Sequence, residues 1–170
     1  NLISENIPGY IPTIGLAGAG PWLKPSKEVE EKRIGRNRYP LIAGPDAPLP
    51  FVHSGLALEA MLKEEPYPLK CLYCAGANPV VNMQNAKKVW EAFLGLDLLV
   101  VTDFFMTPTA ELADIVLPAA TWLEMDYIGD FWKRHGYLLP RRKVVQIGEC
   151  RSDHEMLNDL AHRVGQGEFW

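Results

Sequence analysis

Three short apolar runs, separated by segments with a helical pattern, constrain the fold of this chain more than any other feature. The runs are "LKCLYCA" at 69–75, "LDLLVVTD" at 96–103 and "IVLPAA" at 115–120. Runs of this length without polar alternation are typical of parallel strands that are covered on both faces. The alternation of strands and helices therefore predicts an α/β fold, a Rossmann-like three-layer domain with a mainly parallel sheet.

The helical segments carry recognisable start signals. Ser54 and Thr107 are each predicted to be an N-cap, and Ser152 with Glu155 has the spacing of a capping box. The predicted helices lie within 54–66, 82–95, 107–114 and 151–165. The predicted buried face of the helix within 82–95 consists of Met83, Ala86, Val89, Trp90, Phe93 and Leu94. That of the helix within 151–165 consists of Met156, Leu157, Leu160, Ala161 and Val164.

The chain is predicted to have two parts. Residues 1–52 form a connecting segment rich in proline and glycine, with a possible edge strand at "RYPLIAG", 38–44. Residues 53–170 form the Rossmann-like domain. Within it, the aromatic and basic stretch 125–150 is predicted to be a loop followed by a short extended pair.

Composition narrows the classes of function. A net charge of −4 does not suit a nucleic-acid partner, and no apolar run reaches the roughly 20 residues that direct membrane insertion needs. Residue 1 is Asn rather than Met, so we expect a fragment of a longer polypeptide. The three cysteines are predicted to be buried structural residues, and neither they nor the histidines have the spacing of a metal site.

Right-handed crossovers bring the loops that follow successive parallel strands to one edge of the sheet, where open α/β sheets bind ligands. Gly76 and Asn78 lie in the first of these loops. Gly76 allows close approach of the backbone, the Asn78 amide both donates and accepts, and the amide groups at the start of the next helix favour anions. The alternative is an Asn-Pro turn that only connects two elements.

Two carboxylates are further candidates. Asp103 ends the second strand and suits ribose hydroxyl groups, or else is a solvated or helix-capping residue. Asp153 suits the dipole of the last helix, although a carboxylate can also accept hydrogen bonds from N1–H and the 2-amino group of guanine. The chain lacks the G-x-G-x-x-G turn and the Walker A loop of ordinary dinucleotide and ATP sites.

The continuous stretch "GANPVVNMQNAKKVWEAFLGLDLLVVTDFFMTPTAELADIVLPAATWLE", followed by "GECRSDHEMLNDLAHRVG", closely resembles the molybdopterin oxidoreductase family, the dimethyl-sulfoxide-reductase-like molybdenum and tungsten enzymes. The resemblance covers about residues 40 to 168. It implies that Asn78 is the turn residue at the cofactor, that Thr102 and Asp103 are the strand-end pair, and that Asp153 is the acid at the last helix. Met125 aligns where some members place a lysine that contacts the cofactor.

The resemblance also implies a function. The domain would hold the guanosine diphosphate part of one of two molybdopterin guanine dinucleotide cofactors, with Gly76, Asn78, Thr102, Asp103 and Asp153 as contacts, in the catalytic subunit of a molybdenum or tungsten oxidoreductase. A 4Fe-4S cluster would lie elsewhere in the parent enzyme, so we expect the isolated fragment to be inactive. The implied partners are the remaining domains of the same chain and an iron–sulfur electron-transfer subunit.

Two alternatives stay open at this point. One is a cofactor-free scaffold domain of an electron-transfer complex. The other is an unrelated nucleotide-binding module, such as the central domain of a thiamine-diphosphate enzyme.

Overall fold

The computed structural model describes residues 26–45, 52–129 and 139–169. The chain divides into two compact units, the first formed by 1–69 with 130–139 and the second by 70–129 with 140–170. The predicted domain boundary between residues 52 and 53 stays a prediction. The proline-rich stretch 1–25 lies outside the described residues.

Among its described residues, the first unit contains three short helices, α3 (Lys27–Glu31), α4 (Pro40–Ala43) and α5 (Ser54–Lys63). Arg33 joins two of them, because its guanidinium group donates to the carbonyl oxygens of Ala43 at 3.1 Å and Gly44 at 3.2 Å and pairs with Glu30. The buried apolar side chains of this unit are Ile34, Ala43, Leu58 and Ala60.

Two sequence predictions fail in this unit. The possible edge strand at 38–44 is wrong, because Pro40 opens the one-turn helix α4 and the Gly44 amide closes it on the Pro40 carbonyl at 3.0 Å. Ser54 is not the N-cap of α5 but its first residue. His53 takes the capping position, and its Nδ1 accepts a hydrogen bond from the Leu56 amide at 3.4 Å.

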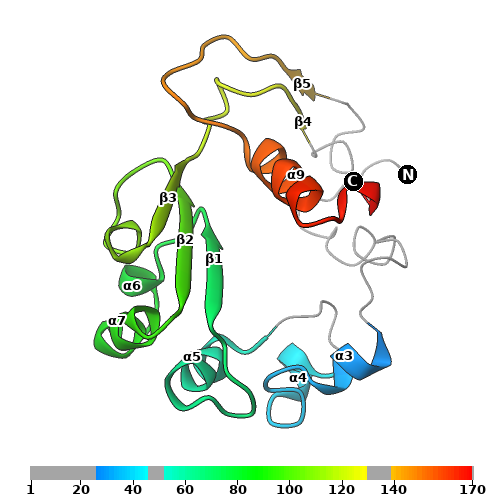
Figure 1. The fold of residues 1–170 in the computed structure, drawn as a ribbon, viewed down its shortest axis with the longest axis vertical. Helices are drawn as coiled ribbons and strands as arrows, with labels where there is room; N and C mark the ends of the chain where they lie inside the picture. Colours follow the sequence, from blue (N-terminus) through cyan, green and yellow to red (C-terminus); the bar gives the residue numbers. More distant parts are fainter. Residues whose placement is uncertain (1–25, 46–51, 130–138, 170) are drawn as a thin grey trace, which may run out of the picture. The chain divides into compact units, whose positions relative to one another are not determined.

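The second unit is built on a sheet of three parallel strands, β1 (Cys71–Ala75), β2 (Leu98–Asp103) and β3 (Ile115–Pro118), in the order β1-β2-β3. The predicted α/β fold with a parallel sheet is confirmed. The central strand carries the core, since Leu99 and Val101 are 1% and 0% exposed. Figure 1 shows α6 and α7 to one side of these strands and α9 to the other.

The connection from β1 to β2 contains two helices rather than the single predicted one. These are α6 (Pro79–Asn82) and α7 (Ala86–Leu94). Asn85 separates them in a left-handed conformation, and its side chain caps α7 by accepting from the Lys88 amide at 3.2 Å. The predicted buried face is correct for Val89 and Phe93. It is wrong for Trp90 and Leu94, which are 42% and 61% exposed.

The predicted helix at 107–114 is only a 3-10 turn, η2 (Ala110–Leu112). Its N-cap residue is Thr109 rather than the predicted Thr107, although Thr107 Oγ1 accepts a hydrogen bond from the Ala110 amide at 3.2 Å. Asp114 ends the connection by accepting a hydrogen bond from the Leu99 amide at 2.7 Å, immediately before β3.

The last part of the second unit contains β4 (Tyr127–Gly129), β5 (Leu139–Arg141), α9 (Asp153–Arg163) and η3 (Gly167–Phe169). The two strands pair with each other, as the predicted extended pair requires. The capping box of Ser152 and Glu155 is confirmed. Of the predicted buried stripe of α9, Met156 and Ala161 are buried, whereas Leu160 and Val164 are exposed.

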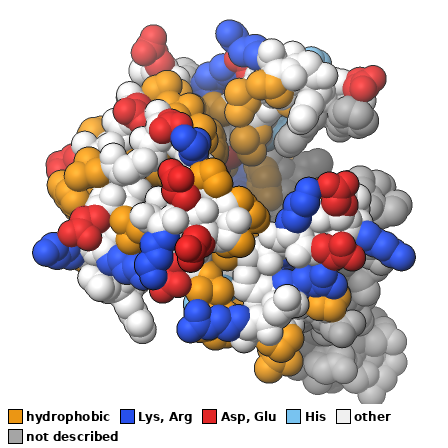
Figure 2. All heavy atoms as spheres, turned by 60° about the horizontal axis from the view of Figure 1, so that its bottom comes forward, with side chains coloured by type: hydrophobic (Ala, Val, Ile, Leu, Met, Phe, Trp, Pro, Cys, Tyr) orange, Lys and Arg blue, Asp and Glu red, His pale blue; other side chains and the backbone are white. Residues whose placement is uncertain are grey.

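Charged side chains of both signs are interspersed with exposed hydrophobic ones on the face seen in Figure 2. Cys74 and Cys150 are buried as predicted, but Cys71 is exposed, so the prediction is wrong for that residue. Within the described ranges, no helix combines the length and apolar character that a membrane crossing requires.

Candidate functional site

The carboxyl ends of the parallel strands bring three of the predicted site residues together. The Gly76 amide donates to the Thr102 carbonyl at 2.9 Å, so the loop after β1 lies against the end of β2. On the other side of β2, the Ala119 amide donates to the Asp103 carbonyl at 3.2 Å. Gly76, Thr102 and Asp103 therefore share the sheet edge that the crossover rule predicts.

Gly76 is suited to close approach by a ligand. Its φ of +58° lies in the left-handed region, which L side chains rarely adopt, and a Cβ atom built there would meet nothing within 4 Å. The turn therefore leaves open space above its backbone.

Asn78 occupies the N-cap position of α6, but its side chain makes no capping hydrogen bond. Its Oδ1 instead accepts a hydrogen bond of 2.7 Å from the Thr109 hydroxyl group. Thr109 is fully buried and comes from the loop after β2, at the same edge of the sheet. Sequence reasoning missed Thr109, because only the fold brings it to Asn78, 31 positions earlier.

The amide groups at the start of α6 do not form the predicted anion site. Pro79 has no N–H group, the Val80 amide donates to Thr109 Oγ1 at 3.2 Å, and the Val81 amide donates to the Asn78 carbonyl at 3.0 Å. This part of the prediction is wrong, and the Asn78 side chain remains as the polar group that the turn presents.

Thr102 and Asp103, the pair at the end of β2, have different roles. Asp103 Oδ1 accepts from the amides of Phe104 at 2.6 Å and Phe105 at 3.3 Å, so the carboxylate holds the turn after β2. Thr102 is fully buried, and its Oγ1 has no hydrogen-bond partner in the part of the chain that the structure describes. A buried hydroxyl group without a partner is uncommon and suits a polar atom supplied by a ligand or water.

Asp153 reaches the same edge from α9. The segment before the helix extends the sheet beside β3, because the Ala120 amide donates to the Arg151 carbonyl at 2.8 Å and the Arg151 amide to the Pro118 carbonyl at 3.1 Å. The helix starts two residues later, so its N-terminus lies near the carboxyl ends of the strands.

A cavity of about 850 Å³ opens at this N-terminus. Residues 124–127, 140–143 and 152–155 line it. Asp153 and Met125 are among them, whereas Gly76, Asn78, Thr102 and Asp103 are not. The predicted site residues thus fall into two groups, one around the ends of β1 and β2 and one around the start of α9.

Glu124 lines the cavity and connects three segments of the chain through its hydrogen bonds. The sequence alone did not predict a role for it. Its carboxylate accepts from the thiol of Cys150 at 3.0 Å, from the amide and hydroxyl of Thr121 at 3.0 and 2.8 Å, and from the Ile147 amide at 3.0 Å. These donors, the Cys150 thiol first, lower the pKa of Glu124 to about 2. The same interaction raises the pKa of the Cys150 thiol.

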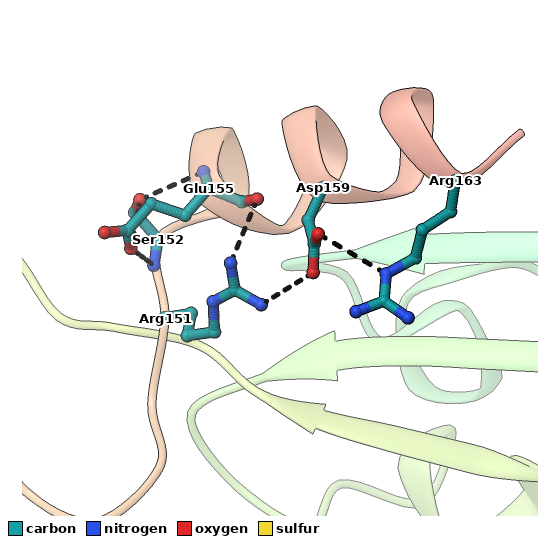
Figure 3. A network of polar contacts seen from close by, with 5 residues as sticks. All are labelled: Arg151, Ser152, Glu155, Asp159 and Arg163. Carbon is teal, nitrogen blue, oxygen red and sulfur yellow. Dashed lines mark hydrogen bonds and ion pairs between the residues drawn. The ribbon is translucent and has the colours of Figure 1, made fainter. Parts of the chain in front are cut away.

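A network of ion pairs runs along α9 and the residue before its N-cap (Figure 3). Arg151 pairs with Asp159 at 3.1 Å and donates to the Glu155 carbonyl at 3.4 Å, and Asp159 also pairs with Arg163 at 3.3 Å. Hydrogen bonds from Arg151 and then Arg163 lower the pKa of Asp159. Arg151 is therefore committed to the protein rather than to a ligand.

Within the described ranges, no group of three or more histidine, cysteine, aspartate or glutamate side chains could hold a metal ion. The groups at the sheet edge are an amide, a hydroxyl and a carboxylate, and the cavity is lined by carboxylates together with Arg141, Arg142, Lys143 and His154. They are suited to hydrogen bonding with the polar parts of an organic ligand.

The sequence matches the family model "Molybdopterin oxidoreductase" over residues 29–163. It is 40% identical over 116 residues to "F420-dependent formate dehydrogenase subunit alpha" of Methanocaldococcus jannaschii, covering 68% of this chain and 17% of the relative. It is 30% identical over 160 residues to "Acetylene hydratase" of Syntrophotalea acetylenica, covering 94% of this chain and 21% of the relative. This chain thus spans about a fifth of the length of these relatives.

A solved structure, "Acetylene Hydratase from Pelobacter acetylenicus", superposes with a TM-score of 0.72 and 26% sequence identity. The superposition covers 84% of this chain and 22% of the hydratase chain.

Proposed function

This chain belongs to the molybdopterin oxidoreductase family, and from that premise we propose that its second unit holds the guanosine diphosphate part of a molybdopterin guanine dinucleotide. In this proposal, Asp153 contacts the guanine base, Asp103 and Thr102 contact the ribose, and Asn78 beside Gly76 contacts the diphosphate. The molybdenum or tungsten ion and the pterin would supply the chemistry of the reaction, while these residues bind and orient the cofactor.

The observation that carries the proposal is the state of the four acidic residues that line the cavity. Glu124 accepts four hydrogen bonds, and Glu155 is occupied by the capping box. Asp126 pairs with Arg142 at 3.5 Å and accepts from the Lys143 amide at 2.9 Å. Asp153 is the one whose carboxylate has no hydrogen bond or ion pair with the described residues.

A carboxylate without a partner among the described residues can accept hydrogen bonds from a ligand in the cavity. Guanine offers two neighbouring donors, N1–H and the 2-amino group, which a single carboxylate can accept together, whereas adenine lacks this pair. Asp153 lies in the first turn of α9, where the helix dipole favours a negatively charged side chain. The chain's own residues thus match the base end of a guanine nucleotide.

The open turn at Gly76 and the amide of Asn78 match the remaining parts. A diphosphate presents acceptor oxygens, and an amide NH₂ group donates to them. Thr102 has a buried hydroxyl group in need of a partner, next to the strand end where a ribose would lie. The residues present therefore fit a nucleotide diphosphate and do not form a site for the metal ion itself.

At the level of the whole enzyme, we propose a molybdenum or tungsten oxidoreductase with a 4Fe-4S cluster in another part of the chain and an iron–sulfur electron-transfer subunit as partner. The relatives are named as dehydrogenase and hydratase, and one as "Dimethyl sulfoxide/trimethylamine N-oxide reductase". Because relatives with different reactions share this domain, its task is to hold a cofactor rather than to select the substrate.

The test uses the full-length polypeptide. Molybdenum and tungsten per polypeptide are measured by mass spectrometry, and GMP is measured after acid hydrolysis. We expect both metal and GMP. Their joint absence from a preparation with intact iron–sulfur clusters would favour the cofactor-free scaffold.

The residue assignment is tested with Asp153→Asn against Asp126→Asn, a second carboxylate of the same cavity. Asp153→Asn leaves a guanine donor without an acceptor, so cofactor binding weakens by about 1–3 kcal/mol. Asp126→Asn leaves GMP per polypeptide unchanged, because Asp126 already pairs within the protein. Full GMP content in Asp153→Asn would reject Asp153 as the base contact.

A further inference from the structure

The N-terminus of α6 is capped by a residue from another loop. Asparagine is among the best N-cap residues, and Asn78 occupies the N-cap position, yet it makes no capping hydrogen bond. The Val80 amide, which an N-cap side chain normally serves, donates instead to Thr109 Oγ1 at 3.2 Å. Thr109 has taken over the capping role and has released the Asn78 side chain from it.

The same hydroxyl group fixes how Asn78 is turned. A threonine hydroxyl carries one hydrogen, and its oxygen already accepts from Val80, so the hydrogen is available for one acceptor. Asn78 Oδ1 lies 2.7 Å from Thr109 Oγ1 and accepts that hydrogen bond. The reverse orientation of the amide would leave the Thr109 hydrogen without an acceptor at a position that is fully buried.

The oxygen of the Asn78 amide is therefore bound to Thr109, and this fixes the position of its NH₂ group. With Oδ1 bound to Thr109, the NH₂ group is the end that remains for a ligand, and it can only donate. Thr109 is also rigid, since a β-branched side chain in a packed site has few rotamers.

We propose that Thr109 is a positioning residue that holds Asn78 as a hydrogen-bond donor to the diphosphate of the cofactor. This inference rests on the proposed function and adds that Asn78 is the hydrogen-bond donor in its contact with the diphosphate. The Val80 amide donates to Thr109 Oγ1, and the Thr109 hydroxyl group donates to Asn78 Oδ1. The backbone of α6 therefore determines, through Thr109, that the Asn78 NH₂ group is directed to the ligand.

The alternative state of Asn78 is known from its residue type. Without the Thr109 hydroxyl group, the Val80 amide loses that partner, and the Asn78 oxygen, at the N-cap position, is suited to accept from it. Asn78 then turns its oxygen to its own helix and leaves the ligand. Thr109→Val should therefore lose cofactor while α6 keeps a cap.

The experiment compares three variants of the full-length polypeptide with the unchanged protein, namely Thr109→Val, Thr109→Ser and Asn78→Asp. The readouts are GMP per polypeptide after acid hydrolysis and the thermal unfolding temperature. Thr109→Ser keeps the hydroxyl group. Asn78→Asp keeps the acceptor for Thr109 and the shape of the side chain, but presents an oxygen where the NH₂ group was.

We expect Thr109→Ser to retain GMP at the level of the unchanged protein. Thr109→Val and Asn78→Asp should both bind the cofactor about ten- to a hundredfold more weakly, which is the usual effect of losing a hydrogen bond to a charged group. Asn78→Asp should do so without a large change in unfolding temperature. It therefore keeps the test decisive if Thr109→Val does not fold.

The other outcomes are also decisive. Full GMP content in Thr109→Val, with loss in Asn78→Asp, would overturn the role of Thr109 and leave the proposed function standing. Full GMP content in Asn78→Asp would overturn the donor assignment itself. A lack of GMP in the unchanged protein would overturn the proposed function, and this inference with it.

Discussion

The parallel sheet and the region around Glu124 are stabilised in opposite ways, although they belong to one unit. In the sheet, the central strand buries Leu99 and Val101 almost completely. We call Glu124 and its partners Thr121, Ile147 and Cys150 the polar junction. There a buried carboxylate accepts four hydrogen bonds instead. The contribution of the sheet core to the stability of this unit is therefore insensitive to pH, whereas the contribution of the polar junction depends on pH.

The largest expected effect comes from the sheet. Leu99→Ala removes a side chain that is 1% exposed and leaves a cavity, so the free energy of unfolding falls by about 2–5 kcal/mol. The matched control is Leu98→Ala, next along the strand and 37% exposed, which should cost much less. Chemical denaturation of both variants measures the difference. Equal losses would show that burial in β2 does not carry the stability of the sheet.

The next effect belongs to the polar junction. Glu124→Gln keeps the shape of the side chain but replaces one oxygen by an NH₂ group, which faces donors from Thr121 or from Ile147 and Cys150. Donors facing each other in a buried site are unfavourable, so the unfolding temperature at pH 7 should fall.

The pH dependence of this effect has a defined sign. Folding lowers the pKa of Glu124 from 4.5 to about 2. The stabilisation by its charge is therefore fully present above pH 4.5 and is lost as the pH falls from about 4.5 to about 2. Unfolding temperatures measured across this window should fall for the unchanged protein and fall less steeply for Glu124→Gln. Parallel profiles would mean that Glu124 does not carry the acid sensitivity, whereas Leu99→Ala should shift the profile without changing its slope.

The contrast also explains how much of the fold the sequence predicted. The strands could be read from apolar runs, and the start of α9 from Ser152 and Glu155, because these signals lie within a few residues of each other. The long helix predicted at 82–95 failed at Asn85, which adopts a left-handed conformation and caps α7 with its side chain. The edge strand at 38–44 failed because Pro40 starts a helix as readily as it borders a strand.

The candidate site divides along the same line. Gly76, Thr102 and Asp103 were predicted to meet, and they do, because parallel strands with right-handed crossovers align their carboxyl ends. Thr109 and Glu124 were missed, because their partners lie 31 and up to 26 positions away and are joined only by the fold. No pattern in the local sequence distinguishes a threonine that caps a distant helix from one in an ordinary loop.

A smaller effect is expected at Asn85, on the sheet side of the comparison. Asn85→Ala removes the cap of α7 and replaces asparagine, whose polar side chain suits the left-handed region, by alanine, which lacks that side chain, so it should cost about 1–2 kcal/mol. Gln84→Ala, at the neighbouring exposed position, is the control and should be nearly neutral. Chemical denaturation measures both, and a neutral Asn85→Ala would mean that α7 does not need its cap.

The smallest effect is expected in the network of Figure 3. Arg151→Met removes the pairing with Asp159, but both side chains are partly exposed, at 50% and 38%, and Arg163 still pairs with Asp159. Exposed ion pairs contribute little and are screened by salt. The unfolding temperature should therefore fall slightly at low ionic strength and converge with that of the unchanged protein in 1 M salt, where the screening length is about 3 Å. Glu124→Gln should keep its deficit in the same salt, because the polar junction is buried. If salt abolished both deficits, the polar junction would behave like the surface network, and the distinction between buried and exposed polar contacts in this unit would fail.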